Sequence, residues 1–353
     1  MVIDRPWRVM RLLGGLVVVA LLFEVAIRIL IGAPQGAEQL PLLRVQPDRR
    51  LGYKPIPGDQ HYGYDELIQL NSLGLRGPEV IPKRPGEHRI LALGGTQLYG
   101  LGIADTALVT SVLKDRLNQD RGERTYRVMN FGVRAFTLGQ QLHLLEDVGV
   151  TVEPDHVVVF IDIYSFGEID SLKYYERIAA RDWFMLDLDA KPAGIVLGKW
   201  YLTQAARQSA LVTWLYSFYK VWSQRDSFAS KVLRGEKDTN VERVLTFVKK
   251  QVDAFVTLAN KHGLDLSLVL ISLPSQVSHD QPNLFYQLEF RNIALARRLP
   301  FFDLLEPLRS LYQRTGHFPV APFDAHYDAL AHQEIAQFLL DAMRKDDDTI
   351  TVS

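Results

Sequence analysis

Two short stretches of the 353-residue chain carry side chains that could do chemistry, and each adjoins an expected regular element. In Arg89 to Gly100, a short apolar run leads into two glycines and the hydroxyl-bearing Thr96. An apolar run of this length is typical of a buried strand, and functional groups collect beyond the carboxyl ends of strands in open α/β sheets. Near the other end of the chain, Asp324 and His326 place a carboxylate and an imidazole just ahead of an expected helix.

Strands and helices alternate along the sequence around these stretches. The apolar patterns predict strands at 90–93, 126–131, 156–164, 266–273 and 301–305, and helices at 106–119, 138–148, 240–261, 284–298 and 329–343. The run at 156–164 is almost unbroken Val, Ile and Phe, as expected when helices cover both faces of a parallel sheet. The alternation therefore predicts an α/β fold with a parallel sheet and right-handed crossovers.

Four phrases of the chain resemble motifs of the SGNH (GDSL-type) hydrolases. Residues 94–100, Gly-Gly-Thr-Gln-Leu-Tyr-Gly, resemble the first motif, Gly-Asp-Ser-x-x-x-Gly, and residues 130–133, Asn-Phe-Gly-Val, resemble the Asn-x-Gly phrase. Residues 323–332, Phe-Asp-Ala-His-Tyr-Asp-Ala-Leu-Ala-His, are similar to the family's Asp-x-His-x-Asn-x-x-Gly-His. Residues 71–77, Asn-Ser-Leu-Gly-Leu-Arg-Gly, resemble a phrase that membrane-anchored relatives carry before their first strand.

The resemblance implies a three-layer α/β/α, flavodoxin-like domain with an acyl-transfer site at the carboxyl edge of its sheet. By resemblance, Thr96 is the nucleophile, His326 the general base and Asp324 the partner that orients the base. The oxyanion donors would be the Thr96 backbone N–H, Gly132 and Ser165. The residues and spacings alone are also compatible with a turn glycine at 132 and with a loop histidine that caps a helix.

Five residues depart from the family pattern. In the C-terminal phrase, Asp328 replaces an asparagine and Ala331 a glycine. Gly95 replaces the aspartate of the first motif, Thr96 replaces the serine, and Ser165 stands where the family has an oxyanion asparagine. The extra methyl group of threonine crowds the attack and stiffens the side chain. Loss of one oxyanion donor typically costs about a hundredfold to a thousandfold in rate.

Two functions of different kinds follow from this pattern. One is an envelope protein that acts on O-acyl esters of a polysaccharide, as a hydrolase or acyltransferase, through a Thr/His/Asp arrangement. The other is a catalytically weakened SGNH fold that serves as a scaffold or binding subunit of a membrane protein complex. The first implies a glycan substrate and the second implies membrane-protein partners.

The N-terminal segment is predicted to be a membrane anchor. Leu12 to Ala33 is mostly apolar and long enough to cross a bilayer, and three arginines precede it. By the positive-inside rule, the N-terminus is expected in the cytoplasm and the body in the periplasm of a bacterial inner-membrane protein. Glu24 and Arg28 lie inside the segment at a spacing that lets them pair. A cleaved signal peptide is the alternative, but the apolar stretch is long for one.

The remaining segments complete the expected domain organisation. The anchor spans 1–33, a linker and lead-in segment 34–88, the SGNH-like domain 89–345, and a polar tail 346–353. An aromatic-rich insertion at 165–235 interrupts the domain. It could form a lid, a glycan-stacking surface, a membrane or partner contact, or an ordinary packed subdomain.

Composition narrows the partners and cofactors. The net charge is −1, which gives no indication of a nucleic-acid partner, and the chain has no cysteine. The nine histidines show no zinc-ligand spacing, and the Gly-x-Gly-x-x-Gly dinucleotide fingerprint is absent. No metal and no cofactor is therefore expected.

Overall fold

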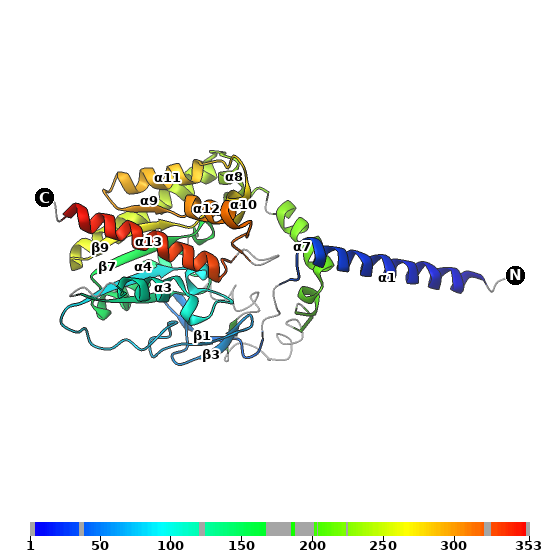
Figure 1. Cartoon of the computed structure of the whole chain (residues 1–353), viewed down its shortest axis with the longest axis horizontal. Helices are drawn as coiled ribbons and strands as arrows, with labels where there is room; N and C mark the ends of the chain where they lie inside the picture. Colours follow the sequence, from blue (N-terminus) through cyan, green and yellow to red (C-terminus); the bar gives the residue numbers. More distant parts are fainter. Residues whose placement is uncertain are drawn as a thin grey trace. The chain divides into compact units, whose positions relative to one another are not determined.

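The structure is a computed structural model that describes residues 4–34, 39–119, 124–166, 185–187, 201–202, 204–223, 225–320 and 326–350 (Figure 1). Its residues fall into two compact units. One contains helices α1 and α7, within Met1–Ala37 and Pro192–Arg225, and the other contains the central sheet with its helices. The two units are described separately.

A five-stranded parallel sheet forms the centre of the larger unit. Its strands are β5 (Glu87–Gly94), β6 (Thr125–Gly132), β7 (His156–Ile161), β9 (Asp265–Leu270) and β10 (Phe301–Asp303). Their order is β10-β9-β7-β5-β6, and every neighbouring pair is parallel. The order reverses between β5 and β7, which makes this pair the topological switch point where ligands bind in such sheets. The predicted parallel α/β sheet is confirmed.

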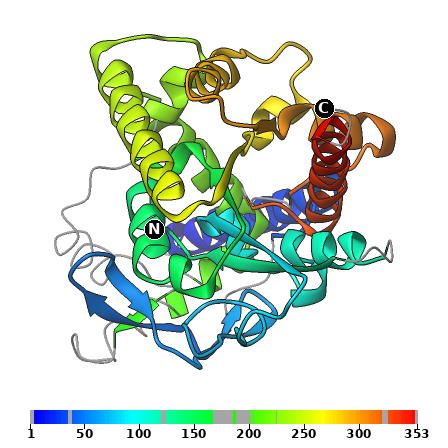
Figure 2. The same ribbon diagram turned by 90° about the vertical axis from the view of Figure 1, so that its left-hand side faces the viewer.

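Helices cover both faces of this sheet. One face carries α3 (Val109–Leu117), α12 (Leu305–Thr315) and α13 (Ala329–Ile350), and the other carries α4 (Leu138–Asp147), α9 (Thr239–His262) and α11 (Phe285–Leu295). Figure 2 shows α9 and α13 on opposite sides of the sheet. The shorter helices are α2 (Thr96–Tyr99), α8 (Phe228–Leu233), α10 (Pro274–Ser278) and the 3-10 turns η1 (Asp105–Ala107), η2 (Gly149–Val152) and η3 (Ile163–Ser165).

Helix α9 illustrates how local sequence fixes an element. Asp238 caps its start by accepting a hydrogen bond from the Val241 N–H at 2.9 Å. Gly263 ends it in the left-handed conformation, with φ of 65°, that glycine adopts at low cost. Its buried residues recur at helical spacing and face the core, as the sequence predicts.

The segment expected to be a linker is partly structured. Residues 43–69 form four strands, β1 (Leu43–Asp48), β2 (Gly52–Pro55), β3 (Gln60–Gly63) and β4 (Glu66–Gln69). β1 also pairs with β8 (Met185–Asp187), and Tyr53 and Ile68 are fully buried. The short strands combine polar and apolar residues and contain no long apolar run. The sequence therefore predicts a linker here from its Pro- and Gly-rich composition.

Several other predicted boundaries differ from the structure, among them that of the fourth strand, which ends at Leu270 rather than at 273. The third strand ends at Ile161 rather than at 164, because the Ser165 N–H bonds to the Asp162 carbonyl and starts a tight turn. The last helix continues to Ile350 through a stretch expected to be a polar tail. Many aromatic residues of the predicted insertion lie in 167–184 and 188–200, outside the described residues.

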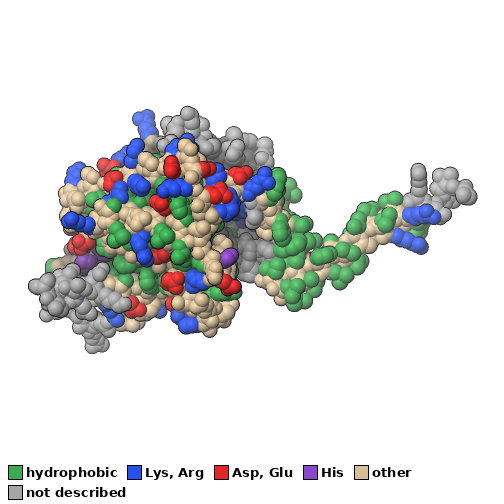
Figure 3. All heavy atoms as spheres, turned by 90° about the horizontal axis from the view of Figure 1, so that it is seen from above, with side chains coloured by type: hydrophobic (Ala, Val, Ile, Leu, Met, Phe, Trp, Pro, Cys, Tyr) green, Lys and Arg blue, Asp and Glu red, His purple; other side chains and the backbone are tan. Residues whose placement is uncertain are grey.

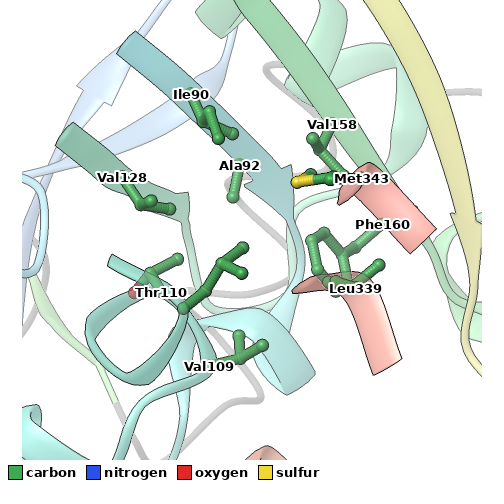
Figure 4. Close-up of a pocket in the computed structure, with 10 residues that line it drawn as sticks. Ile90, Ala92, Val109, Thr110, Val128, Val158, Phe160, Leu339 and Met343 are labelled. Carbon is green, nitrogen blue, oxygen red and sulfur yellow. The ribbon is translucent and has the colours of Figure 1, made fainter. Parts of the chain in front are cut away.

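The packing of α3 and α13 on the sheet leaves a small apolar cavity of about 10 Å³ (Figure 4). A cavity of that size is close to the smallest that holds one water molecule. Between α3, α13 and the sheet, the described residues therefore leave no room for a substrate at this cavity. The lining residues are Ile90, Ala92, Val109, Thr110, Leu113, Val128, Val158, Phe160, Leu339 and Met343.

The smaller unit contains the apolar helix α1 (Asp4–Leu30) and helix α7 (Ala210–Ser223). Trp7–Leu30 of α1 is a candidate membrane span by length and composition, with a mean hydropathy of 2.4. Figure 3 shows hydrophobic side chains along this helix and Lys and Arg side chains near its amino-terminal end.

Candidate functional site

The exits of three neighbouring strands meet around the turn that contains Thr96. Thr96 starts α2 directly after β5, and Ser165 ends the turn that follows β7. A Cβ added to Gly95 would lie 3.1 Å from the Phe136 carbonyl oxygen and 3.5 Å from Ser165 Oγ. The structure therefore brings Thr96, Ser165 and the loop after β6 together at the switch point.

Glycines in this region allow α2 to lie against two strands. A Cβ at Gly94 would lie 2.6 Å from the Leu98 Cβ, and one at Gly132 would lie 2.6 Å from the Tyr99 nitrogen. Both distances are shorter than real Cβ atoms show. These two glycines of the motif frame are therefore explained by close packing.

Arg76, from the phrase at residues 71–77, holds the loop that follows α2. Its buried guanidinium donates hydrogen bonds to the backbone carbonyls of Tyr99, Gly100 and Ile103. It also pairs with Asp105 at 2.7 Å. The resemblance assigns no role to this phrase. In the structure, Arg76 binds the backbone at the end of the first motif.

A buried chain of hydrogen bonds reaches Tyr99 from the lead-in segment. His61 Nδ1 lies 3.0 Å from Asp59 Oδ2, and His61 Nε2 lies 2.5 Å from the Tyr99 hydroxyl. The chain contains an acid, an imidazole and a hydroxyl, but all three side chains are at most 1% exposed. Burial lowers the pKa of His61 and raises the pKa of Tyr99. The chain therefore holds α2 in place and has no access to a substrate.

The Thr96 hydroxyl accepts a hydrogen bond from the Ala135 backbone N–H at 2.9 Å. Ala135 has a φ of 58°, a left-handed conformation that is uncommon outside glycine. Thr96 is half-buried, and its own backbone N–H has no acceptor among the described residues. The Ala135 N–H therefore faces the Thr96 hydroxyl oxygen itself. Sequence reasoning missed Ala135 because nothing in its residue type signals this conformation.

Gly132, the expected oxyanion glycine, has its N–H engaged elsewhere. This N–H donates to Asn130 Oδ1 at 2.8 Å, and Asn130 Nδ2 donates to the Leu98 carbonyl at 3.0 Å. The Asn-x-Gly phrase thus ties β6 to α2. The N–H that faces the Thr96 hydroxyl belongs to Ala135, three residues further along the chain.

Ser165 lies next to this position and is buried. Its hydroxyl makes no hydrogen bond to the part of the chain that the structure describes.

His326 is half-buried and approaches the first motif through its neighbour. The Tyr327 N–H donates to Gln97 Oε1 at 3.0 Å, so the residues next to His326 and Thr96 are bonded to each other. Tyr64, in the turn between β3 and β4, brings its hydroxyl 3.4 Å from His326 Nδ1. No hydrogen bond joins Thr96 to His326, both of which are described residues. Asp324 lies outside the described residues.

The other polar residues of the C-terminal phrase have structural partners. Asp328 caps α13 by accepting from the Ala331 N–H at 2.9 Å and also pairs with His317. His332 is buried, and its Nδ1 accepts from the Val109 N–H at 3.0 Å, at the start of α3. Burial lowers the pKa of His332 to about 4, so it is neutral at pH 7. Neither residue is placed to react with a substrate at Thr96.

Within the described ranges, no group of three or more His, Asp or Glu side chains converges as a metal site would require. The groups at the switch point are the Thr96 hydroxyl, the Ala135 N–H and the Ser165 hydroxyl, and the segment that carries the His326 imidazole bonds to Gln97 through Tyr327. This set can stabilise charge on a carbonyl oxygen and move a proton, which are the operations of acyl transfer.

No family model and no curated protein matches this sequence. Among solved structures, the chain is similar to an acetyl xylan esterase, with a TM-score of 0.41, 10% identity, and coverage of 72% of this chain and 98% of the esterase. It is also similar to a psychrotrophic esterase from Pseudoalteromonas sp., with a TM-score of 0.42, 12% identity, and coverage of 74% and 99%. A lipase/acylhydrolase from Enterococcus faecalis has a TM-score of 0.40, 12% identity, and coverage of 73% and 96%.

The strand order and the helices on both faces of the sheet define a three-layer α/β/α protein with a parallel sheet. One N-terminal apolar helix accompanies it.

Proposed function

We propose that this protein is a membrane-anchored SGNH-like enzyme of the cell envelope that acts on O-acyl esters of a polysaccharide. The observation that carries the proposal is the hydrogen bond between the Ala135 N–H and the Thr96 hydroxyl at the switch point of the sheet. This bond places the Ala135 N–H beside the Thr96 hydroxyl, which occupies the nucleophile position of the motif frame. In acyl transfer, a backbone N–H close to the reacting oxygen stabilises the oxyanion if it faces that oxyanion once the nucleophile has attacked.

In the proposed reaction, the Thr96 oxygen attacks the ester carbonyl and His326 takes its proton. Asp324 would orient the His326 ring. The negative charge of the tetrahedral intermediate would be held by the N–H groups of Thr96 and Ala135, with Ser165 as a further donor. The bond between the carbonyl carbon and the sugar oxygen then breaks, and His326 returns the proton to that oxygen. Water or a second hydroxyl next attacks the Thr96 ester and releases the acyl group.

The same geometry predicts slow turnover. The Thr96 hydroxyl must turn from Ala135 toward His326 for proton transfer, and a β-branched side chain rotates about χ1 less freely than serine. A serine at this position removes that restriction while it keeps the hydroxyl.

The test uses the full chain in detergent micelles with a small acetyl ester and an acetylated polysaccharide. We expect His326→Ala to abolish turnover, and Thr96→Ser to raise kcat at least about tenfold, which corresponds to about 1.4 kcal/mol of barrier. His262→Ala, at the exposed end of α9, is the matched histidine control and should be neutral. Turnover that survives His326→Ala would exclude this mechanism.

A second candidate function is a catalytically weakened scaffold or binding subunit of a membrane complex. The specific observation that favours it is the lack of a hydrogen bond between Thr96 and His326, two described residues, together with the engaged N–H of Gly132. It predicts no turnover by wild type or by Thr96→Ser, and co-purification of membrane partners that Thr96→Ala does not disturb. Loss of the cellular phenotype in a stably folded Thr96→Ala protein would exclude it.

A further inference from the structure

Helix α1 carries a carboxylate within its apolar stretch, and helix α7 satisfies it. Glu24 accepts hydrogen bonds from the Ser209 hydroxyl at 2.8 Å, the Ala210 N–H at 2.9 Å and the Leu211 N–H at 2.8 Å. It also accepts one from Arg28 Nε at 2.7 Å. The carboxylate of α1 therefore caps the N-terminus of α7, where orphan N–H groups and the positive end of the helix dipole favour an anion.

The second charge of α1 strengthens the same contact. Arg28 donates through Nη2 to the Gln208 carbonyl, just before α7 begins. The Glu24–Arg28 pair is thus bonded on both sides and leaves no net charge at the junction. This explains how α1 tolerates two ionic side chains, since polar groups inside a membrane span need partners.

The contact also fixes where α7 starts relative to the apolar helix. Glu24 lies six residues before Leu30, the end of α1, which is about 9 Å along the helix axis at 1.5 Å per residue. If α1 spans a bilayer, α7 begins at the depth of the far membrane interface.

The surface of α7 is apolar and aromatic although it is exposed. The exposed large hydrophobic residues in and beside it are Tyr201, Leu202, Val212, Leu215, Tyr216, Phe218, Tyr219 and Trp222, which are 46–74% exposed. Spacings of three and four place Val212, Tyr216, Tyr219 and Trp222 on one face. Such a continuous apolar surface marks a contact with a membrane or with another protein.

The chemistry of α7 favours lipid. Tyrosine and tryptophan are enriched at membrane interfaces, and α7 contains no acidic residue. Lys220 lies in its last turn, and the Arg225 guanidinium lies 5.5 Å above the Trp222 ring, so the cations gather at one end. Cations beside an apolar helix are attracted to anionic headgroups. At 14 residues, or about 21 Å, the helix is too short to cross a bilayer.

We propose that α7 is an interfacial membrane helix, which lies in the outer surface layer of the bilayer and is held there by Glu24 and Arg28 of α1. This inference rests on the proposed membrane anchor. It adds a second lipid contact, through which the chain is attached to the membrane by two helices rather than by a single flexible stem.

The natural lack of cysteine allows a direct test by site-directed spin labelling of the full chain. Three single variants carry the label: Tyr219→Cys on α7, Leu16→Cys on α1 and Thr246→Cys on the exposed face of α9. Each is reconstituted in vesicles of phosphatidylcholine and phosphatidylglycerol. Collision rates are measured with oxygen, which enters the bilayer, and with a water-soluble nickel chelate.

We expect labels at 16 and 219 to favour oxygen and the label at 246 to favour the nickel chelate. If 16 favours oxygen but 219 behaves like 246, the anchor stands and the interfacial helix is excluded. If 219 is shielded from both reagents, α7 packs against protein, and the proposal is overturned in favour of self-association. If 16 also favours nickel, the anchor itself fails.

Glu24→Gln tests the connection between the two helices. The amide keeps the size of the side chain but loses the charged acceptor, so we expect the oxygen-to-nickel ratio at 219 to fall about fivefold, as for loss of a helix cap. The label at 16 should be unchanged, which shows that the protein is still inserted. Glu242→Gln on α9 is the matched control. An unchanged ratio at 219 in Glu24→Gln would show that Glu24 does not hold α7.

Discussion

At the scale of single residues, the backbone of Ala135 matters more to the site than its side chain. Its left-handed conformation turns its N–H toward the Thr96 hydroxyl. A non-glycine residue in this region costs about 1–2 kcal/mol, and strain of that kind is often found at functional sites. The donor beside Thr96 is therefore the Ala135 N–H, whereas the sequence predicts Gly132 as an oxyanion donor.

Removing the Ala135 N–H should test this donor directly. Replacement of Ala135 by lactic acid changes the amide to an ester, which deletes the N–H and also weakens the Arg134 carbonyl as the acceptor for the Tyr53 hydroxyl. We expect kcat toward an acetyl ester to fall about a hundredfold to a thousandfold, as for loss of one oxyanion donor. The same replacement at Ala107, whose N–H donates to the Ala104 carbonyl at 2.9 Å and not to Thr96, should leave kcat unchanged. Equal effects at both positions would contradict the assignment.

His332 should make the fold sensitive to mild acid. Its pKa is about 4 in the folded protein against 6.5 ordinarily, so the unfolded chain binds more protons between these pH values. Stability should therefore fall with decreasing pH, by about 1.4 kcal/mol per unit between pH 6.5 and pH 4. His332→Asn keeps an acceptor for the Val109 N–H and removes this titration.

The measurement is the unfolding midpoint of both proteins across that range. The stability difference between wild type and His332→Asn should shift in favour of the variant as the pH falls. A difference that does not change with pH would show that His332 is not buried and neutral.

The sequence predicts which residues lie at the carboxyl edge of the sheet, because the spacing of the motifs is retained. Ser165 lies beside Gly95, the residue before Thr96, and a hydrogen bond joins Gln97 to Tyr327, the neighbours of Thr96 and His326. The role of Ala135 could not be predicted, because a single alanine carries no signal of a left-handed conformation. The contact of Tyr64 with His326 was also hidden, because it joins residues far apart in the chain.

At the scale of elements, the motif frame depends on close approach between α2 and two strands. Gly132→Ala would place its Cβ within 3 Å of the Tyr99 nitrogen, the Leu98 carbonyl carbon and Asn130 Oδ1. We expect a destabilisation of about 1–3 kcal/mol, as for overpacked sites. Denaturant unfolding measures it.

Gly139→Ala is the matched control for this substitution. Gly139 lies in α4, where the nearest atom to an added Cβ is a Gln251 side-chain oxygen at 3.7 Å. Alanine favours a helix over glycine by up to about 1 kcal/mol, so this variant should be as stable as wild type or more stable. If both variants behave alike, close packing at Gly132 is not the cause.

The long elements were predictable because their hydrophobic period is regular over many residues. Helix α9 and strand β6 begin and end within one residue of the predicted limits. The strands of the lead-in segment were missed, since β2, β3 and β4 have only four residues each and pair through local geometry rather than through a long apolar pattern. Tertiary pairing decides such short strands.

At the scale of the whole molecule, the proposed anchor predicts which side of the membrane each part occupies. Arg8 and Arg11 precede the apolar stretch, so the N-terminus should be cytoplasmic and the sheet unit external. A membrane-impermeant maleimide applied to intact spheroplasts should label Thr246→Cys and leave Val2→Cys unlabelled. Labelling of Val2→Cys requires permeabilised cells. The reverse pattern would overturn the orientation.

The contacts of Arg76 have a consequence for how this turn can change over time. Its guanidinium bonds to three backbone carbonyls of residues 99–103, which every amino acid possesses. Arg76 thus fixes the backbone path of residues 99–103, whatever side chains these residues carry. The residue at position 96 could change during evolution while the turn kept its shape. A retained motif spacing is therefore better evidence of common ancestry than of catalytic activity.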